Sequence, residues 1–205
     1  MTKIALFGTS ADPPTAGHQS IIHWLSNNFD YVGIWAADNP YKDHKTSLDH
    51  RLAMLKLLID DVDSPGDNIY LSKSLSHRRS LISVGKAKEI WGENSDYFFV
   101  IGSDIVKQIR QWYRIDELLA QVSLLIVPRP GYTINESDLK ALEDIGGKCQ
   151  IADLNAPAVS STAYRKDGNE NVLIQPVQDY IHQEKTIRMN SNSNKLTLED
   201  FKSRG

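Results

Sequence analysis

Two short segments of the chain combine hydroxyl, glycine and basic residues in patterns that suit phosphate binding. The first is GTSADPPTAGH, residues 8–18, and the second is VSSTAYR, residues 159–165. Glycine lets a backbone approach a ligand closely, Ser and Thr offer N–H and O–H donors, and Arg can hold two anionic oxygens at once. We therefore interpret both segments as candidate phosphate-binding loops.

His18 is the most informative residue of the first segment. With Ile21, Ile22 and Leu25 it recurs at the spacing of one helical face, which predicts that its ring points inward. A lone inward histidine is usually a hydrogen-bonded core residue, but the Gly/Ser/Thr loop just before it favours a ligand-binding role. The helix start would add free N–H groups and a positive dipole end, which attract phosphate.

The second segment has the composition of a helix start. Ser160 to Thr162 are typical N-terminal residues of a helix, and Arg165 follows Ser161 by about one turn. Hydroxyls, free helix N–H groups and a guanidinium on one face suit a polyphosphate. The alternative is a helix cap with a surface arginine. The chain has neither G-x-x-x-x-G-K-[ST] nor G-x-G-x-x-G, which excludes a P-loop kinase and a standard dinucleotide-binding protein.

Strands and helices that alternate along the chain must position these segments. Runs rich in Ile, Val, Tyr and Phe predict strands over residues 3–7, 31–37, 68–72, 97–101, 122–127 and 150–154. Helices are predicted over residues 19–29, 48–59, 81–91, 105–111, 115–120 and 139–145, with Thr46 and Asp49 as a capping box for the second. Consecutive apolar residues, as in YFFVI, are typical of strands buried on both faces. We therefore predict an α/β fold with a doubly wound, mainly parallel sheet, whose strand ends bind ligands.

The composition limits the classes of function. The chain of 205 residues has a net charge of -3, so no broad basic field favours nucleic acid or a membrane surface. The single cysteine, Cys149, excludes an intramolecular disulfide and a thiolate metal site. The start, MTKIALFGTS, lacks the layout of a signal peptide, and no apolar stretch is long enough to cross a bilayer. We expect a cytoplasmic protein with one domain over residues 1–188 and a polar extension over residues 189–205.

An ordered set of motifs resembles one enzyme family. TAGH, residues 15–18, resembles the (H/T)-x-G-H motif of the nucleotidyltransferase superfamily, and VSSTAYR resembles its I-S-S-T-x-x-R signature. Between them lie NPYK, HRLAML, IGSD, Trp112 and VPRPGY. In this order the set is similar to the bacterial nicotinate-mononucleotide adenylyltransferases, and the resemblance spans about residues 3–188.

The resemblance implies a Rossmann-like fold and a reaction. AMP would pass from ATP to the 5′-phosphate of nicotinate mononucleotide, giving nicotinate adenine dinucleotide and pyrophosphate. Such a reaction needs positioning and charge stabilisation rather than a protein nucleophile. Mg²⁺ would accompany ATP, held by phosphate oxygens and water, so no protein ligand for the metal is assigned. Nicotinamide mononucleotide as acceptor, and a catalytically silent nucleotide-binding protein, remain alternatives.

The resemblance also implies roles for individual residues. Catalytic roles fall to His18, Thr15 and Arg165. ATP would be bound by Gly8, Thr9, Ser10, Gly17, His18, Gly102, Asp104, Ser161, Thr162 and Arg165, and the acceptor by Lys42, Trp112 and Arg129. Simpler alternatives are that Asp104 caps a helix beginning at Ile105, that Trp112 packs in the core, and that Lys42 and Arg129 are surface charges.

The sequence departs from the family pattern in three places, one of which is the extension of residues 189–205 past the family core. Ala11 replaces a usual Phe, and residues 79–84 replace the Ser-Tyr-Thr segment with which many bacterial members recognise nicotinate. Arg78, Arg79 or backbone N–H groups could take over that recognition. The acceptor preference and the oligomeric state therefore stay open, and a homo-oligomer is compatible with the sequence.

Overall fold

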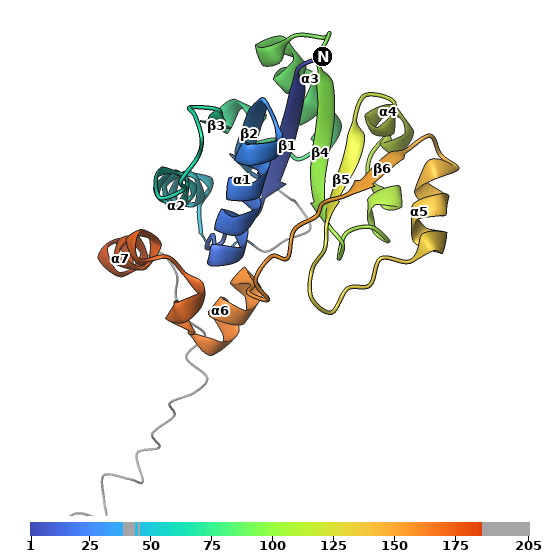
Figure 1. Ribbon diagram of the computed structural model, residues 1–205. Helices are drawn as coiled ribbons and strands as arrows, with labels where there is room; N and C mark the ends of the chain where they lie inside the picture. The colour runs from blue at the N-terminus through green and yellow to red at the C-terminus, as the bar shows by residue number, and fades with distance from the viewer. Residues whose placement is uncertain (39–43, 45, 186–205) are drawn as a thin grey trace, which may run out of the picture.

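A six-stranded parallel sheet forms the middle layer of the computed structural model, which describes residues 1–38, 44 and 46–185 (Figure 1). Its strands are β1 (Lys3–Thr9), β2 (Tyr31–Ala36), β3 (Ile69–Leu71), β4 (Asp96–Gly102), β5 (Ser123–Val127) and β6 (Lys148–Ile151). Their order is β3-β2-β1-β4-β5-β6, and all neighbouring pairs are parallel. The direction of winding reverses between β1 and β4, where ligands bind in open sheets of this kind. The predicted doubly wound parallel sheet is confirmed.

Alternate residues of β1 belong to two separate cores. Ala5 and Phe7 face one side of the sheet, and Ile4 and Leu6 face the other. The first core is covered by α1 (Ala16–Asn28), α2 (Leu48–Asp60), α6 (Ser161–Asp167) and α7 (Gln175–Glu184). The second is covered by α3 (Ser80–Trp91), α4 (Ile115–Leu119) and α5 (Glu136–Glu143). Burial on both faces explains why apolar residues run consecutively in these strands.

Several local predictions were wrong in position or type. Helix α2 is capped by Ser47, whose Oγ accepts a hydrogen bond from the N–H of His50, and not by a box of Thr46 and Asp49. Helix α1 begins at Ala16, three residues before the predicted start, because Thr15 is its N-cap. Strand β6 begins two residues before its predicted start, because Lys148 already pairs with Ser123 of β5.

The predicted helix over residues 105–111 does not form. Ile105 N–H donates to the Gly102 carbonyl at 3.0 Å and Gln108 N–H to the Ile105 carbonyl at 2.8 Å, so the chain follows tight turns. The only helical piece in this segment is the 3₁₀ turn η2 (Ile109–Gln111). Asp104 therefore caps no α-helix, and its carboxylate forms an ion pair with Arg129 instead.

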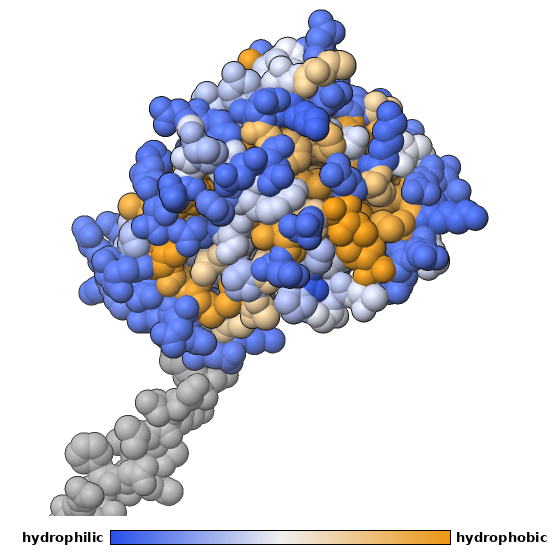
Figure 2. All heavy atoms as spheres, viewed as in Figure 1, coloured by the Kyte–Doolittle hydropathy of each residue, from blue (hydrophilic) through white to orange (hydrophobic). Residues whose placement is uncertain are grey.

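The surface is mixed in character. On the face shown in Figure 2, hydrophilic residues predominate, and hydrophobic side chains gather in separate patches, one of them near α7. Within the described ranges, no helix combines the length and the apolar character needed to span a bilayer.

Candidate active site

One cavity of about 510 Å³ opens at the carboxyl ends of β1, β2, β4 and β5. It lies beside the point at which the winding of the sheet reverses, as expected for a ligand site in this architecture. Ten residues predicted from the sequence line it: Gly8, Thr9, Ser10, Thr15, Gly17, His18, Gly102, Asp104, Trp112 and Arg129. The fold thus brings residues from five separate segments to one cavity.

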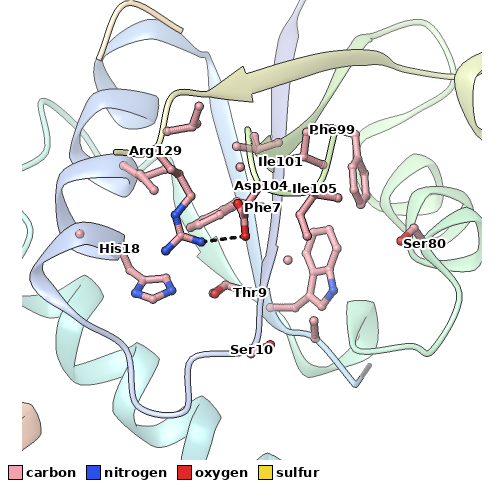
Figure 3. Close-up of a pocket in the computed structure, with 18 of the residues that line it drawn as sticks. Phe7, Thr9, Ser10, His18, Ser80, Phe99, Ile101, Asp104, Ile105 and Arg129 are labelled. Carbon is pink, nitrogen blue, oxygen red and sulfur yellow. Dashed lines mark hydrogen bonds and ion pairs between the residues drawn. The ribbon is translucent and has the colours of Figure 1, made fainter. Parts of the chain in front are cut away.

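His18 and Thr15 make a contact that orients the histidine ring. The backbone N–H of Thr15 donates to Nδ1 of His18 at 3.0 Å, and Oγ1 of Thr15 lies 2.9 Å from the same nitrogen. A backbone N–H can only donate, so Nδ1 accepts, and a neutral ring carries its proton on Nε2. The ring points into the cavity, as the helical spacing predicted (Figure 3). Thr15 itself is fully buried, which fits an orienting role.

Glycines at two strand ends leave room for neighbouring side chains. A Cβ added at Gly8 would lie 2.5 Å from the ring of Trp35, far inside van der Waals contact. A Cβ at Gly102 would lie 2.3 Å from Oδ1 of Asp104 and 2.8 Å from Cδ of Arg129. The sequence suggested close approach of a ligand at Gly8. The structure places Gly8 in the lining of the cavity, with a tryptophan ring in the space beside its Cα.

Arg129 and Asp104 form an ion pair inside the cavity. Nη1 of Arg129 lies 3.2 Å from Oδ2 of Asp104, and the two side chains are 37% and 24% exposed (Figure 3). The other carboxylate oxygen of Asp104 is buried and has no hydrogen-bond partner among the described residues. Arg129 is therefore not a freely solvated surface charge, and its partner Asp104 lines the cavity with it.

Ser103 fixes the loop that carries Arg129. Its hydroxyl accepts from the backbone N–H of Arg129 at 2.9 Å and donates to the carbonyl of Tyr132 at 3.1 Å. Ser103 is 6% exposed, so both bonds are shielded from water. Sequence reasoning named the residues on either side, Gly102 and Asp104, but not this one.

Trp112 combines packing with exposure to the cavity. Its ring meets Phe99 edge to face, with centroids 6.1 Å apart and an interplanar angle of 87°. It also lines the cavity. The two alternatives weighed from the sequence, core packing and contact with an acceptor ring, are therefore compatible with one another.

Arg51 is a further functional candidate that sequence reasoning missed. This arginine of α2 is 2% exposed, and its Nη1 donates to the carbonyls of Ser10 at 2.9 Å and of Ala37 at 2.8 Å. Both carbonyl residues line the cavity, so Arg51 joins the loops that follow β1 and β2. Burial lowers the pKa of Arg51, while the charges of Asp12 and Asp38 act against that shift. The sequence motif HRLAML could have indicated this buried arginine, because Arg51 interrupts an apolar face of the helix.

The second predicted phosphate loop contacts the first one. Ser160 caps α6 by accepting from the N–H of Ala163, and Ser161 Oγ donates to the Pro13 carbonyl at 2.7 Å. Arg165 donates to the carbonyl of Asp12 and, at 3.3 Å, to Oγ1 of Thr162.

None of Ser161, Thr162 and Arg165 lines the cavity, which is bordered by Ala156, Pro157 and Val159 of the preceding segment. Gly17 has the backbone conformation of a helix, and a Cβ there would lie 3.1 Å from Val159, so the two segments pack closely. Lys42, the remaining predicted site residue, lies outside the described residues.

The described part of the chain contains no group of three or more His, Cys, Asp or Glu side chains that could hold a metal ion. Asp104 is the one carboxylate among the described residues that line the cavity. A divalent cation there would depend on oxygens brought by the substrate and on water.

Comparison with known proteins gives a consistent result. A family model described as cytidylyltransferase-like matches residues 6–167. A Synechocystis protein named "Probable nicotinate-nucleotide adenylyltransferase" is 46% identical over 198 residues, covering 91% of this chain and 99% of the relative. The nicotinate-nucleotide adenylyltransferase of Bacillus subtilis is 30% identical over 139 residues, covering 65% and 73%.

A solved structure shares the fold. The nicotinic acid mononucleotide adenylyltransferase of Plasmodium falciparum, in a structure described as its complex with NaAD, aligns with a TM-score of 0.76. The alignment covers 93% of this chain and 99% of that one, at 21% sequence identity.

Proposed function

Because this chain belongs to the cytidylyltransferase-like family, and within it to the nicotinate-nucleotide adenylyltransferases, we propose that its cavity transfers AMP from ATP to nicotinate mononucleotide. An oxygen of the acceptor 5′-phosphate forms the new bond to the α-phosphorus of ATP. The bond from that phosphorus to the bridging oxygen breaks, and its electron pair leaves with pyrophosphate. The product is nicotinate adenine dinucleotide, a precursor of NAD.

The observation that carries this proposal is the make-up of the cavity at the carboxyl ends of the strands. A hydroxyl-bearing loop, a histidine at a helix start, a carboxylate and an indole ring line it together. These groups match, in order, a polyphosphate, a transferring phosphoryl group, a ribose and an aromatic base. Scaffolds that bind no nucleotide have no need of this combination.

His18 is the proposed stabiliser of the transferring phosphate. With Nδ1 engaged by Thr15, its Nε2–H is the donor that a phosphoryl oxygen would accept. The backbone of Gly8 to Ser10 and the positive end of α1 would share the same charge. Such fixed donors act mainly on charge that develops in the transition state.

Trp112, Asp104 and Arg129 are proposed to bind the sugar and acceptor parts. The indole offers a face for the pyridine ring, and the carboxylate of Asp104, which lines the cavity, would accept from a ribose hydroxyl. Arg129 would lie near the acceptor, as would Lys42. Ser161, Thr162 and Arg165 stay predicted contacts of the leaving phosphates. To reach them, Arg165 would have to exchange its bond to the Asp12 carbonyl for a phosphate oxygen.

We further propose that Mg²⁺ enters with ATP, neutralises phosphate charge and keeps mostly phosphate and water ligands. We propose a cytoplasmic location and small-molecule partners, with no role for nucleic acid or membranes. The net charge of -3 supports this, because binding to anionic polymers or membranes favours basic surfaces.

Pyrophosphate release tests the proposed function. The chain would be mixed with ATP and Mg²⁺, and with either nicotinate or nicotinamide mononucleotide. We expect release with nicotinate mononucleotide and formation of nicotinate adenine dinucleotide. Comparable rates with both acceptors would indicate dual specificity. No release with either would refute adenylyl transfer to pyridine nucleotides and favour a binding-only protein.

A further inference from the structure

One cation of the cavity has a charge that no described carboxylate balances. Three arginines line the cavity: Arg78, Arg79 and Arg129. Arg129 pairs with Asp104 at 3.2 Å, and Arg78 lies 3.8 Å from a carboxylate oxygen of Asp38. Within residues 1–38, 44 and 46–185, Arg79 forms no ion pair with any carboxylate. Its charge is therefore available to an anionic ligand.

An aromatic ring holds the guanidinium of Arg79 in place. Its Cζ lies 4.0 Å from the ring centroid of Tyr113, and its backbone N–H donates to Nδ1 of His77 at 3.0 Å. A cation–π contact positions a guanidinium without using its N–H donors. Tyr113 directly follows Trp112, and both line the cavity. The donor fork of Arg79 thus lies beside the aromatic wall of the cavity.

The two ends of the cavity suit the two ends of an aromatic mononucleotide. Figure 3 shows His18 on one side and Ser80, the neighbour of Arg79, on the other, with the Arg129–Asp104 pair between them. An aromatic mononucleotide carries its phosphate and its ring at opposite ends. If the phosphate lies near His18, the ring lies by the indole wall, and a ring substituent meets Arg79.

We infer that Arg79 is a specificity-determining residue, which recognises a carboxylate on the aromatic ring of the acceptor and disfavours the uncharged carboxamide. The inference rests on the proposed function. A guanidinium pairs bidentately with a carboxylate, whereas a carboxamide offers one acceptor oxygen and no charge. This assigns a role to the segment over residues 79–84, in which the sequence lacks the Ser-Tyr-Thr pattern.

The test compares both acceptors in three variants. Pyrophosphate release would give kcat and KM with nicotinate and nicotinamide mononucleotide for Arg79→Ala, Arg79→Lys and Arg78→Ala. We expect Arg79→Ala to lower the nicotinate-to-nicotinamide ratio of kcat/KM by about tenfold, through KM, as for one lost charge-assisted hydrogen bond. Arg79→Lys should recover part of the ratio, and added NaCl should reduce the wild-type ratio because it screens the pair.

Arg78→Ala is the comparison variant that separates the two neighbouring arginines of the cavity, because the charge of Arg78 already faces Asp38. We expect it to change the ratio by less than about twofold, as is usual for a surface ion pair. A fall of the ratio in Arg78→Ala alone would assign carboxylate recognition to Arg78 and overturn the inference. An unchanged ratio in active Arg79→Ala would overturn the inference, as would equal losses with both acceptors. Wild-type protein inactive with both acceptors would instead refute the proposed function. Calorimetric titration with nicotinate mononucleotide would check the effect on affinity without turnover.

Discussion

A backbone N–H decides which nitrogen of His18 can donate to a ligand. Thr15 donates to Nδ1, so the proton of the neutral ring is on Nε2. The contact between the N-cap residue and the third residue of α1 resembles a capping box, with histidine in the place of the usual Glu or Gln. The T-x-x-H spacing therefore serves helix capping and ring orientation together.

Replacement of His18 tests its proposed role in phosphoryl transfer. We expect His18→Ala to lower kcat by about 10²- to 10³-fold, the usual effect of removing one donor to transition-state charge. The far-ultraviolet circular dichroism spectrum should be unchanged. His23→Ala is the control, because His23 lies on the same helix, is exposed, and has its ring beside the Asp63 carbonyl and outside the lining of the cavity. Equal rates for wild type and His18→Ala would remove His18 from the mechanism.

Trp112 provides a second test of the acceptor end. We expect Trp112→Ala to raise the KM of nicotinate mononucleotide by about tenfold, since base–aromatic stacking contributes about 1–3 kcal/mol per base. The KM of ATP should change much less. Because Trp112 also packs on Phe99, Trp112→Phe serves as a control that keeps an aromatic surface. Equal increases in both KM values would assign Trp112 to packing alone.

The loops after β1 and β2 are joined by one side chain from α2. Arg51 bridges the carbonyls of Ser10 and Ala37 while its Nε is buried without a partner in the described residues. Burying a guanidinium is costly unless its donors form hydrogen bonds. A buried arginine that bridges two loops therefore favours a role in positioning those loops.

Substitution of Arg51 separates positioning from simple stability. We expect Arg51→Met to lower kcat by about 10- to 100-fold, because small displacements of reacting groups have large kinetic effects. The dissociation constants of ATP and of the acceptor, measured one at a time, should each change by less than about threefold. Arg51→Lys should give an intermediate kcat, since it keeps one charge and fewer directed donors.

The control is Lys56→Met, on the same helix, where an exposed lysine pairs with Asp60. It should leave kcat unchanged. Loss of stability is also expected for Arg51→Met, of about 1–3 kcal/mol for buried carbonyls left without donors. If the kcat of folded Arg51→Met equals that of wild type, Arg51 is structural only.

The described protein forms a single sheet with a core on each face. Helix α7 closes the first core and is joined to α2 by a 2.8 Å hydrogen bond between Tyr180 Oη and His50 Nδ1. We therefore propose that the folded domain ends near residue 188, as the sequence predicted.

Truncation tests this boundary. A chain ending at residue 188 should unfold at the same temperature as the full chain and release pyrophosphate at the same rate, because the core contacts described above lie within residues 1–185. Calorimetry and the release assay would measure both. A lower unfolding temperature would show that residues 189–205 belong to the domain. A lower rate of pyrophosphate release at an unchanged unfolding temperature would show that they contribute to the active site.

The sequence by itself determined the order of strands and helices, the parallel sheet and ten of the residues that line the cavity. Hydrophobic periodicity depends on neighbours a few residues apart, so it can be read without the fold. The same local rule failed over residues 105–111, which directly follow two residues with partners far along the chain, Ser103 and Asp104. Arg129 engages the Asp104 carboxylate, and Ser103 holds the loop after β5.

Only the tertiary structure decided which charges are paired. It placed Arg51 between two loops, matched Arg129 and Arg78 with carboxylates, and set Arg79 against Tyr113. It also directed Arg165 to the carbonyl of Asp12, outside the cavity lining. The physical reason is that a hydrogen bond or ion pair acts over a few ångströms in space, whereas its partners lie up to 153 positions apart in the chain.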